Sequence, residues 1–148
     1  MKGIFLDTET NGLNPYTHKI LEIALQVVDL KTGEEKKRYE TVVRQPREVW
    51  DKSDKESLKI NGFQWERVEG GKPPSQVSEE ILSLFKEETL ERKKAVFICQ
   101  NPSFDRAFFS QLVPTEVQER LQWPYHWLDL ASMYWAITLQ KVKKGEGH

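Results

Sequence analysis

Two acidic side chains near the start of the chain, Asp7 and Glu9, have the spacing of a metal-binding pair. They follow an apolar run, residues 2–6, with the pattern of a β-strand, and residues two apart on a strand project to the same face, with Cα atoms about 6.5–7 Å apart. Carboxylates held this close repel each other unless a cation joins them or one takes a proton. Hard divalent cations such as Mg²⁺ prefer carboxylate oxygens. Taken alone, Asp-x-Glu is a common pattern, and a solvated turn explains it more simply than a site does.

A third carboxylate changes this balance. Asp105 lies in the expected first turn of a helix that directly follows the apolar strand 95–99. If that strand neighbours the first strand in the sheet, Asp105 faces Asp7 and Glu9 across the carboxyl edge, where open α/β sheets place ligands. Three converging carboxylates can hold one or two divalent ions, and a pair about 3.5–4 Å apart can activate a water and stabilise the leaving oxygen of a phosphodiester.

The remaining pattern predicts the elements that must position these acids. Runs of β-type residues between turn signals predict five strands, at 2–7, 20–30, 36–43, 95–99 and 125–128. Apolar periodicity and capping signals predict helices that begin near residues 53, 75, 102, 115 and 130. Three antiparallel strands followed by two α–β units make an α/β, mixed five-stranded sheet flanked by helices, as in the ribonuclease H-like fold.

Polar residues at the expected helix starts supply the caps. Ser53 with Glu56, and Thr115 with Gln118, have the capping-box spacing. Asn101 precedes a proline and is the expected cap of the helix that carries Asp105. Asp129 is the expected cap of the last helix.

Composition narrows the class of protein. The 148 residues suit one domain, and 16 aromatic side chains among 38% hydrophobic residues are enough for a core. A net charge of −1 excludes the extended basic surface of a protein that coats nucleic acid, but it does not exclude an enzyme that binds a few nucleotides at a chain end.

The sequence has no apolar run of about 18 residues that would predict a membrane span, and no leader pattern is visible. One cysteine, Cys99, excludes a disulfide framework. We therefore expect a cytoplasmic protein.

Several segments resemble the DEDD (DnaQ-like) 3′–5′ exonuclease superfamily. Residues 5–15, FLDTETNGLNP, look like its first motif, and residues 20–24, ILEIA, like the strand that follows. Residues 101–109, NPSFDRAFF, are similar to the second motif, and residues 127–130, WLDL, to the element after the fifth strand. The likeness covers nearly the whole chain, so residues 1–148 are interpreted as a single exonuclease-like domain.

The resemblance implies a reaction and its cofactor. The reaction is hydrolysis of the terminal phosphodiester of DNA or RNA, which releases nucleoside 5′-monophosphates, with two Mg²⁺ or Mn²⁺ ions. Asp7, Glu9 and Asp105 match three catalytic, metal-binding acids of the superfamily. The implied partner is single-stranded nucleic acid or the 3′ end of DNA or RNA, with no membrane. The resemblance also allows a protein partner, either a second copy of the chain in a homodimer or a polymerase.

The same resemblance implies a nucleotide pocket. Thr10 and Leu13 match positions that line the 3′-terminal nucleotide, and Asn101 and Phe104 lie near that pocket by the same logic. For Leu13 and Phe104, ordinary core packing is an equally good interpretation.

The superfamily's third motif has no match in the chain. That motif carries a fourth acid, preceded by a histidine or tyrosine that acts in water activation, commonly as His-x4-Asp. His18 and His126 lie on or before expected strands, and no aspartate follows His148. We favour a chain that lacks the C-terminal helix with the fourth acid and the base; a protein that naturally ends here, weak or inactive, is the other explanation. A non-catalytic nucleic-acid-binding or interaction module, and a ribonuclease H-like nuclease that cuts internal sites, remain alternatives.

Overall fold

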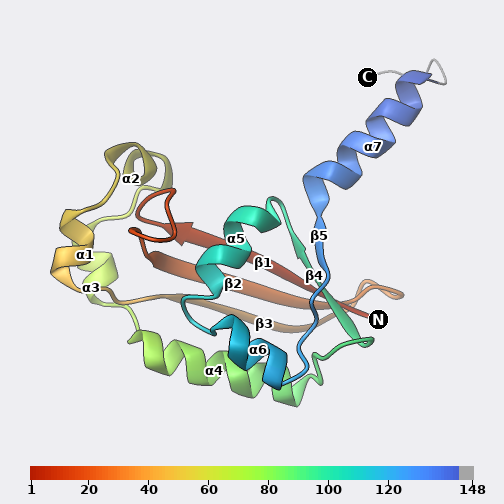
Figure 1. The fold of residues 1–148 in the computed structure, drawn as a ribbon, viewed down its shortest axis with the longest axis horizontal. Coiled ribbons are helices and arrows are strands. Elements are labelled where there is room, and N and C mark those ends of the chain that lie inside the picture. Colours follow the sequence, from red (N-terminus) through yellow and green to blue (C-terminus); the bar gives the residue numbers. More distant parts are fainter. Residues whose placement is uncertain (144–148) are drawn as a thin grey trace.

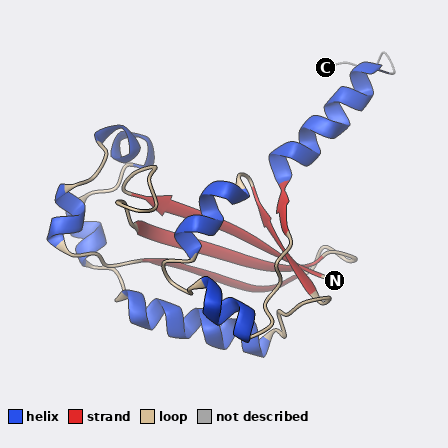
Figure 2. Cartoon of the chain, in the orientation of Figure 1, coloured by secondary structure: helices blue, strands red, loops and turns tan. Residues whose placement is uncertain are grey.

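A mixed five-stranded sheet forms the centre of the molecule in the computed structural model, which describes residues 1–143 (Figures 1 and 2). The strand order is β3-β2-β1-β4-β5. β1 pairs antiparallel with β2 and β2 with β3, whereas β4 lies parallel to both β1 and β5. The strands are β1 (Lys2–Thr10), β2 (Ile20–Asp29), β3 (Glu35–Val42), β4 (Ala95–Cys99) and β5 (Trp127–Asp129). The predicted sheet, with β1 beside β4, is confirmed.

Seven helices accompany the sheet among the residues that the structure describes. They are α1 (Arg47–Asp51), α2 (Lys55–Asn61), α3 (Trp65–Glu69), α4 (Pro74–Glu87), α5 (Pro102–Phe109), α6 (Thr115–Arg120) and α7 (Leu130–Lys143). Helices α4, α5 and α6 cover one face of the sheet, the short helices α1, α2 and α3 gather at one end, and α7 projects away from the body (Figure 1). Within residues 1–143, none of the helices has the length and apolar character needed to cross a membrane.

Two of the helices differ from the sequence-based expectation, and so do two caps. α1 and α3 were not expected, because each is only five residues long and carries no complete apolar period. The cap of α2 is Asp54 rather than Ser53, since the Asp54 carboxylate accepts the Ser57 N–H at 3.1 Å. Pro114 rather than Thr115 stands at the N-cap position of α6, with no side-chain cap.

The central strand β1 divides its side chains between two environments. Ile4 and Leu6 are buried under the helices in the main core, and Thr8 continues that buried face. Asp7 is exposed and Glu9 is partly buried on the alternate positions. Because β1 extends to Thr10, three residues beyond the predicted end, both acids lie on the strand itself.

An aromatic cluster joins the C-terminal strands to the helical layer. Phe97 of β4 is fully buried and stacks on Trp127 of β5, with ring centroids 3.8 Å apart and planes 7° apart. Phe85 of α4 and Phe109 of α5 contact the Phe97 ring, with ring centroids 5.9 and 5.8 Å from it. One residue therefore fixes β4 against β5, α4 and α5, which sets where α5 begins.

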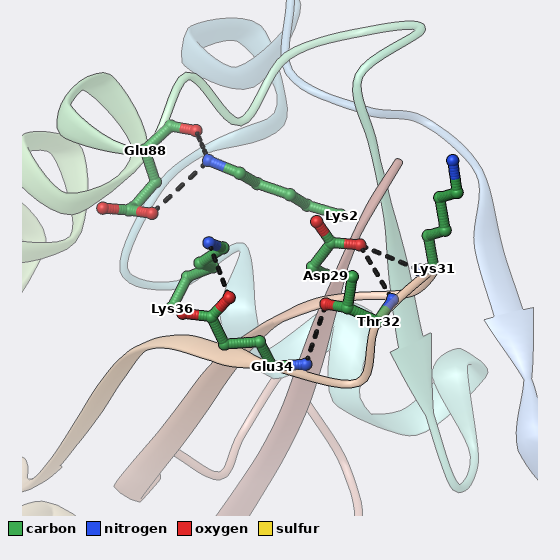
Figure 3. A network of polar contacts seen from close by, with 7 residues as sticks. All are labelled: Lys2, Asp29, Lys31, Thr32, Glu34, Lys36 and Glu88. Carbon is green, nitrogen blue, oxygen red and sulfur yellow. Dashed lines mark hydrogen bonds and ion pairs between the residues drawn. The ribbon is translucent and has the colours of Figure 1, made fainter.

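The end of the sheet at which β1 begins is fastened by polar contacts (Figure 3). Lys2 donates through Nζ to the Glu88 carbonyl at 2.7 Å, which ties the start of β1 to the end of α4. In the β2–β3 turn, Asp29 accepts the backbone N–H groups of Lys31 and Thr32 at 2.9 and 3.3 Å. The start of β1 is thus held by the Lys2 contact, and the neighbouring turn by Asp29.

We expect Phe97→Ala to lower the free energy of unfolding by about 3–5 kcal/mol, because it leaves a cavity among three aromatic rings. Urea denaturation followed by tryptophan fluorescence and circular dichroism measures the loss. Tyr134→Ala, at an exposed position on α7, is the matched control and should change stability by about 0.5 kcal/mol or less. Equal effects of the two substitutions would contradict this role for Phe97.

Candidate active site

Asp105 is held against β1 by two hydrogen bonds from a single residue. The backbone N–H of Thr8 donates to Asp105 Oδ1 at 3.1 Å, and the Thr8 hydroxyl donates to the same oxygen at 2.8 Å. Thr8 and Asp105 are both buried, at 5% and 4% exposure. The structure therefore brings the second acidic segment to the first, as predicted from the strand order.

The geometry of β4 explains why this contact forms. β4 pairs with β1 only from Lys2 to Phe5 and ends at Cys99. β1 continues beyond that point without a strand on this side, and a buried backbone N–H there needs an acceptor. Helix α5 begins just after β4 and places Asp105 in its first turn, where its carboxylate becomes that acceptor.

The start of α5 follows the predicted pattern, with one change. Asn101 occupies the N-cap position and Pro102 the first helical position. The Asn101 side chain, however, makes no capping bond to the helix backbone; its Oδ1 accepts from the Ser103 hydroxyl at 2.8 Å. Phe108 and Phe109 are fully buried and fix the rotation of the helix that aims Asp105 at β1.

The three predicted acids influence one another electrostatically. Burial raises the pKa of Asp105, and the negative charge of Asp7 adds to this, while the two Thr8 donors oppose it. Partial burial also raises the pKa of Asp7. For Glu9, burial raises the pKa first, followed by the charges of Asp7, Glu22 and Asp105. The carboxyl groups are therefore neighbours whose ionised forms repel.

The acids share an edge of the sheet but do not form a closed ligand cage. In the part of the chain that the structure describes, no three Asp, Glu, His or Cys side chains are placed closely enough to hold a metal ion. The donor set nevertheless fits a hard divalent cation, since it consists of carboxylate oxygens. Burial is the main cause of the raised pKa of Glu9 and Asp105, and a cation between Asp7, Glu9 and Asp105 would remove the repulsion that adds to it.

Glu22 is a fourth carboxylate at this edge, and the sequence interpretation gave it no role. It lies directly opposite Glu9 in the β1–β2 pairing. Arg67 of α3 donates to Glu22 Oε2 at 2.8 Å, and the Arg67 charge also lowers the pKa of Glu9. An acid flanked on both sides by apolar residues in the strand 20–30 was the available signal, but its partner on α3 depends on the tertiary fold.

A hollow of about 280 Å³ opens beside Asp7 on the sheet. Phe5, Ala24 and Ile98 contribute apolar surface to it, and Gln100, just after β4, contributes polar surface. Its volume is close to the lower end of small-molecule pockets, about 300 Å³. Space therefore exists beside one of the acids.

The four predicted nucleotide-binding residues, at the end of β1, in the β1–β2 loop and at the start of α5, differ in their burial. Leu13 is 72% exposed, so core packing does not explain it. Thr10 is buried, and its hydroxyl donates to the Gly12 carbonyl at 2.6 Å. Phe104 is partly buried and packs against the main core, so packing does account for much of its surface. Asn101 is exposed. Nucleotide binding by these four residues stays a prediction.

Amide side chains hold this loop in place. Gln111 Nε2 donates to the carbonyls of Pro15 and His18 at 3.1 and 2.9 Å, and its Oε1 accepts the Ile20 N–H at 3.0 Å. Asn11 is fully buried and donates to the backbone of α1. The loop that carries Leu13 is thus fixed by side chains far away in the sequence.

The histidines of the described chain have structural contacts. His18 accepts the Asn14 N–H through Nδ1 at 3.2 Å, and its ring lies where a Cβ at residue 12 would be, which requires Gly12. The backbone carbonyl of His126 accepts the Phe97 N–H at 3.0 Å. His148 lies outside the described residues.

Comparison with known proteins identifies the family. The RNase_T exonuclease family model matches residues 4–133, and the chain belongs to this family of exonucleases. The fold is the ribonuclease H-like fold of DEDD 3′–5′ exonucleases, as the resemblance of the motifs indicated. None of the curated proteins matches the chain.

Solved structures of exonuclease I share the fold at low identity. The structure of E. coli exonuclease I in complex with a dT13 oligonucleotide has a TM-score of 0.71 and 17% identity, and the match covers 94% of this chain and 30% of that chain. The structure described as an ExoI/SSB-Ct complex has a TM-score of 0.70 and 17% identity, and the match covers 91% of this chain and 29% of that chain. This chain therefore spans about 30% of the length of those proteins.

We expect Gln111→Ala to destabilise the protein by about 1–3 kcal/mol, because it leaves two carbonyls and one N–H of the loop without their partner. Hydrogen exchange should become faster at residues 15–20 in particular. Gln140→Ala, at an exposed position on α7, is the control and should leave exchange in the loop unchanged. Unchanged protection of the loop in Gln111→Ala would show that other contacts hold it.

The raised pKa of Asp7 predicts a pH-dependent effect of Asp7→Asn on stability. The native state takes up a proton at this carboxyl at higher pH than the unfolded state, whose pKa is about 3.8. In the protein free of divalent metal, the contribution of Asp7 to stability should therefore fall as pH rises from below 3.8 through the raised native pKa. Asp7→Asn removes this loss, so its melting temperature relative to the unaltered protein should increase over the same interval. A difference that is constant between pH 3 and 7 in EDTA would contradict it.

Proposed function

We propose that the chain is a divalent-cation-dependent exonuclease that removes nucleotides from the 3′ end of single-stranded nucleic acid, releasing nucleoside 5′-monophosphates. The observation that carries this proposal is the attachment of Asp105 to β1 beside Asp7. Membership of the exonuclease family supports it. The structures of exonuclease I in complex with dT13 and dA16 oligonucleotides support single-stranded nucleic acid as the substrate class.

Asp7, Glu9 and Asp105 are the residues that would hold two Mg²⁺ or Mn²⁺ ions. Such ions lower the pKa of a bound water and stabilise charge on the leaving oxygen. The part of the protein is to keep these carboxylates ionised, close together and fixed in direction. The Thr8 donors do this for Asp105, and Arg67 limits the accumulated negative charge beside Glu9.

The 3′-terminal nucleotide would lie between the β1–β2 loop and the start of α5. Leu13 offers exposed apolar surface to a base, and the anchored loop keeps that surface in place at low entropic cost. Thr10, Asn101 and Phe104 would line the same pocket. A cytoplasmic location and a homodimeric or polymerase-associated assembly remain predictions from the sequence.

Residues 1–143 contain no match to the superfamily's His-x4-Asp motif. The proposal therefore assigns three acids to the described residues and names no fourth acid or general base among them.

The test is digestion of a 5′-labelled single-stranded oligonucleotide with Mg²⁺ or Mn²⁺. We expect a ladder of progressively shorter labelled products, which EDTA abolishes, and a loss of activity of at least about 100-fold in Asp7→Asn. Asp51→Asn is the matched control, because Asp51 lies exposed on α1 in an i,i+4 pair with Arg47, and it should retain full activity.

Other outcomes would assign another function. Immediate release of the label as a mononucleotide indicates the opposite polarity. Cleavage of a circular single strand indicates a nuclease that acts on internal sites. Binding of the oligonucleotide without any metal-dependent shortening, by the folded full-length protein, indicates a non-catalytic binding module. Full activity in folded Asp7→Asn would refute the site.

A further inference from the structure

The two hydrogen bonds from Thr8 to Asp105 lead to an inference about how this carboxylate is used. We propose that Thr8 is a positioning residue, which occupies Asp105 Oδ1 and thereby leaves Oδ2 as the single oxygen through which Asp105 binds a divalent cation. The inference rests on the proposed function and adds to it the binding mode of one ligand and the residue that imposes that mode.

Oδ1 has no capacity left for a cation. A carboxylate oxygen presents two lone-pair sites. Thr8 fills both, one with its backbone N–H at 3.1 Å and one with its hydroxyl at 2.8 Å. Water does not compete for these bonds readily, because both residues are nearly inaccessible to solvent. Bidentate binding would require breaking at least one buried hydrogen bond.

The same two bonds fix the direction of Oδ2. A single donor would allow the carboxylate to rotate about its Cβ–Cγ bond, whereas two donors from different points of Thr8 hold Oδ1 in one place. The N–H donor belongs to β1, whose pairing with β2 continues through residue 8. The hydroxyl donor stands on a β-branched side chain, whose χ1 angle has few alternatives. Asp105 is therefore oriented by the sheet and not only by its own helix.

The role also explains the side-chain chemistry at position 8. Thr8 continues the buried face of β1 formed by Ile4 and Leu6, where an apolar residue would be the ordinary choice. A valine there would have nearly the same shape and the same N–H, but no hydroxyl. The hydroxyl is thus the only part of Thr8 whose purpose must be found outside core packing, and its partner is Asp105.

The direct test uses the unaltered protein. In a crystal structure with Mg²⁺, Asp105 Oδ2 should lie about 2.0–2.1 Å from the ion, with Oδ1 still bonded to Thr8. Bidentate coordination by Asp105, or binding through Oδ1 with Thr8 displaced, would overturn the proposal.

Substitutions of Thr8 provide a second test. We expect Thr8→Val to weaken Mn²⁺ binding about 10-fold in calorimetric titration, which is the low end of the effect of residues that orient metal ligands. Thr8→Ser keeps the hydroxyl and should bind within about threefold of the unaltered protein. The kcat on a single-stranded oligonucleotide should fall in Thr8→Val while the KM for the oligonucleotide stays the same. In Asp105→Asn, Mn²⁺ binding should be weakened, and adding Thr8→Val to this variant should weaken it no further.

The outcomes separate this inference from the proposed function. If the unaltered full-length protein binds Mn²⁺ and shortens the oligonucleotide, but folded Thr8→Val matches it in both, only the positioning role is wrong. If Thr8→Ser is as weak as Thr8→Val, the hydroxyl is not the cause, and the role is again wrong. If the unaltered protein neither binds Mn²⁺ nor shortens the strand, the proposed function fails and this inference fails with it.

Discussion

The early end of β4 is the constraint on which the site depends. β4 accompanies β1 only to Phe5, so the last part of β1 has a buried edge without a strand partner. The Thr8 N–H on that edge needs an acceptor, and Asp105 provides one from the helix that follows β4. A single buried contact thus satisfies the backbone of the central strand, docks α5, and joins two acidic segments that are 97 residues apart in sequence.

The core and the site make opposite demands on the free energy of folding. The carboxyl groups at the edge of the sheet repel one another, and burial opposes their ionised forms. These terms destabilise the metal-free native state. The packing of the aromatic cluster around Phe97 offsets them, and the Arg67–Glu22 pair reduces the negative charge locally. The acids can stay close together because the packed core fixes the backbones of β1 and α5 that carry them.

Sequence reasoning succeeded where one local pattern determines the result. Strand alternation placed Asp7 and Glu9 on one face, and two α–β units placed the strand before Asp105 beside β1. It missed two features that depend on tertiary contact. One is the Arg67–Glu22 pair, and the other is the pair of hydrogen bonds that Thr8 donates to Asp105, which requires knowledge of where β4 ends. It also missed α1 and α3, which are too short to show a period.

The alternation of β1 has a consequence for how this sequence can change. Its even positions up to Thr8 belong to the buried face, and its odd positions carry Asp7 and Glu9. Because the side-chain period of a strand is two residues, one inserted or deleted residue before Asp7 would turn both acids towards the helices and the apolar side chains towards the opposite face. Length variation is therefore confined to the turns that flank β1, and within the strand only substitutions of like character are compatible with both the core and the chemistry.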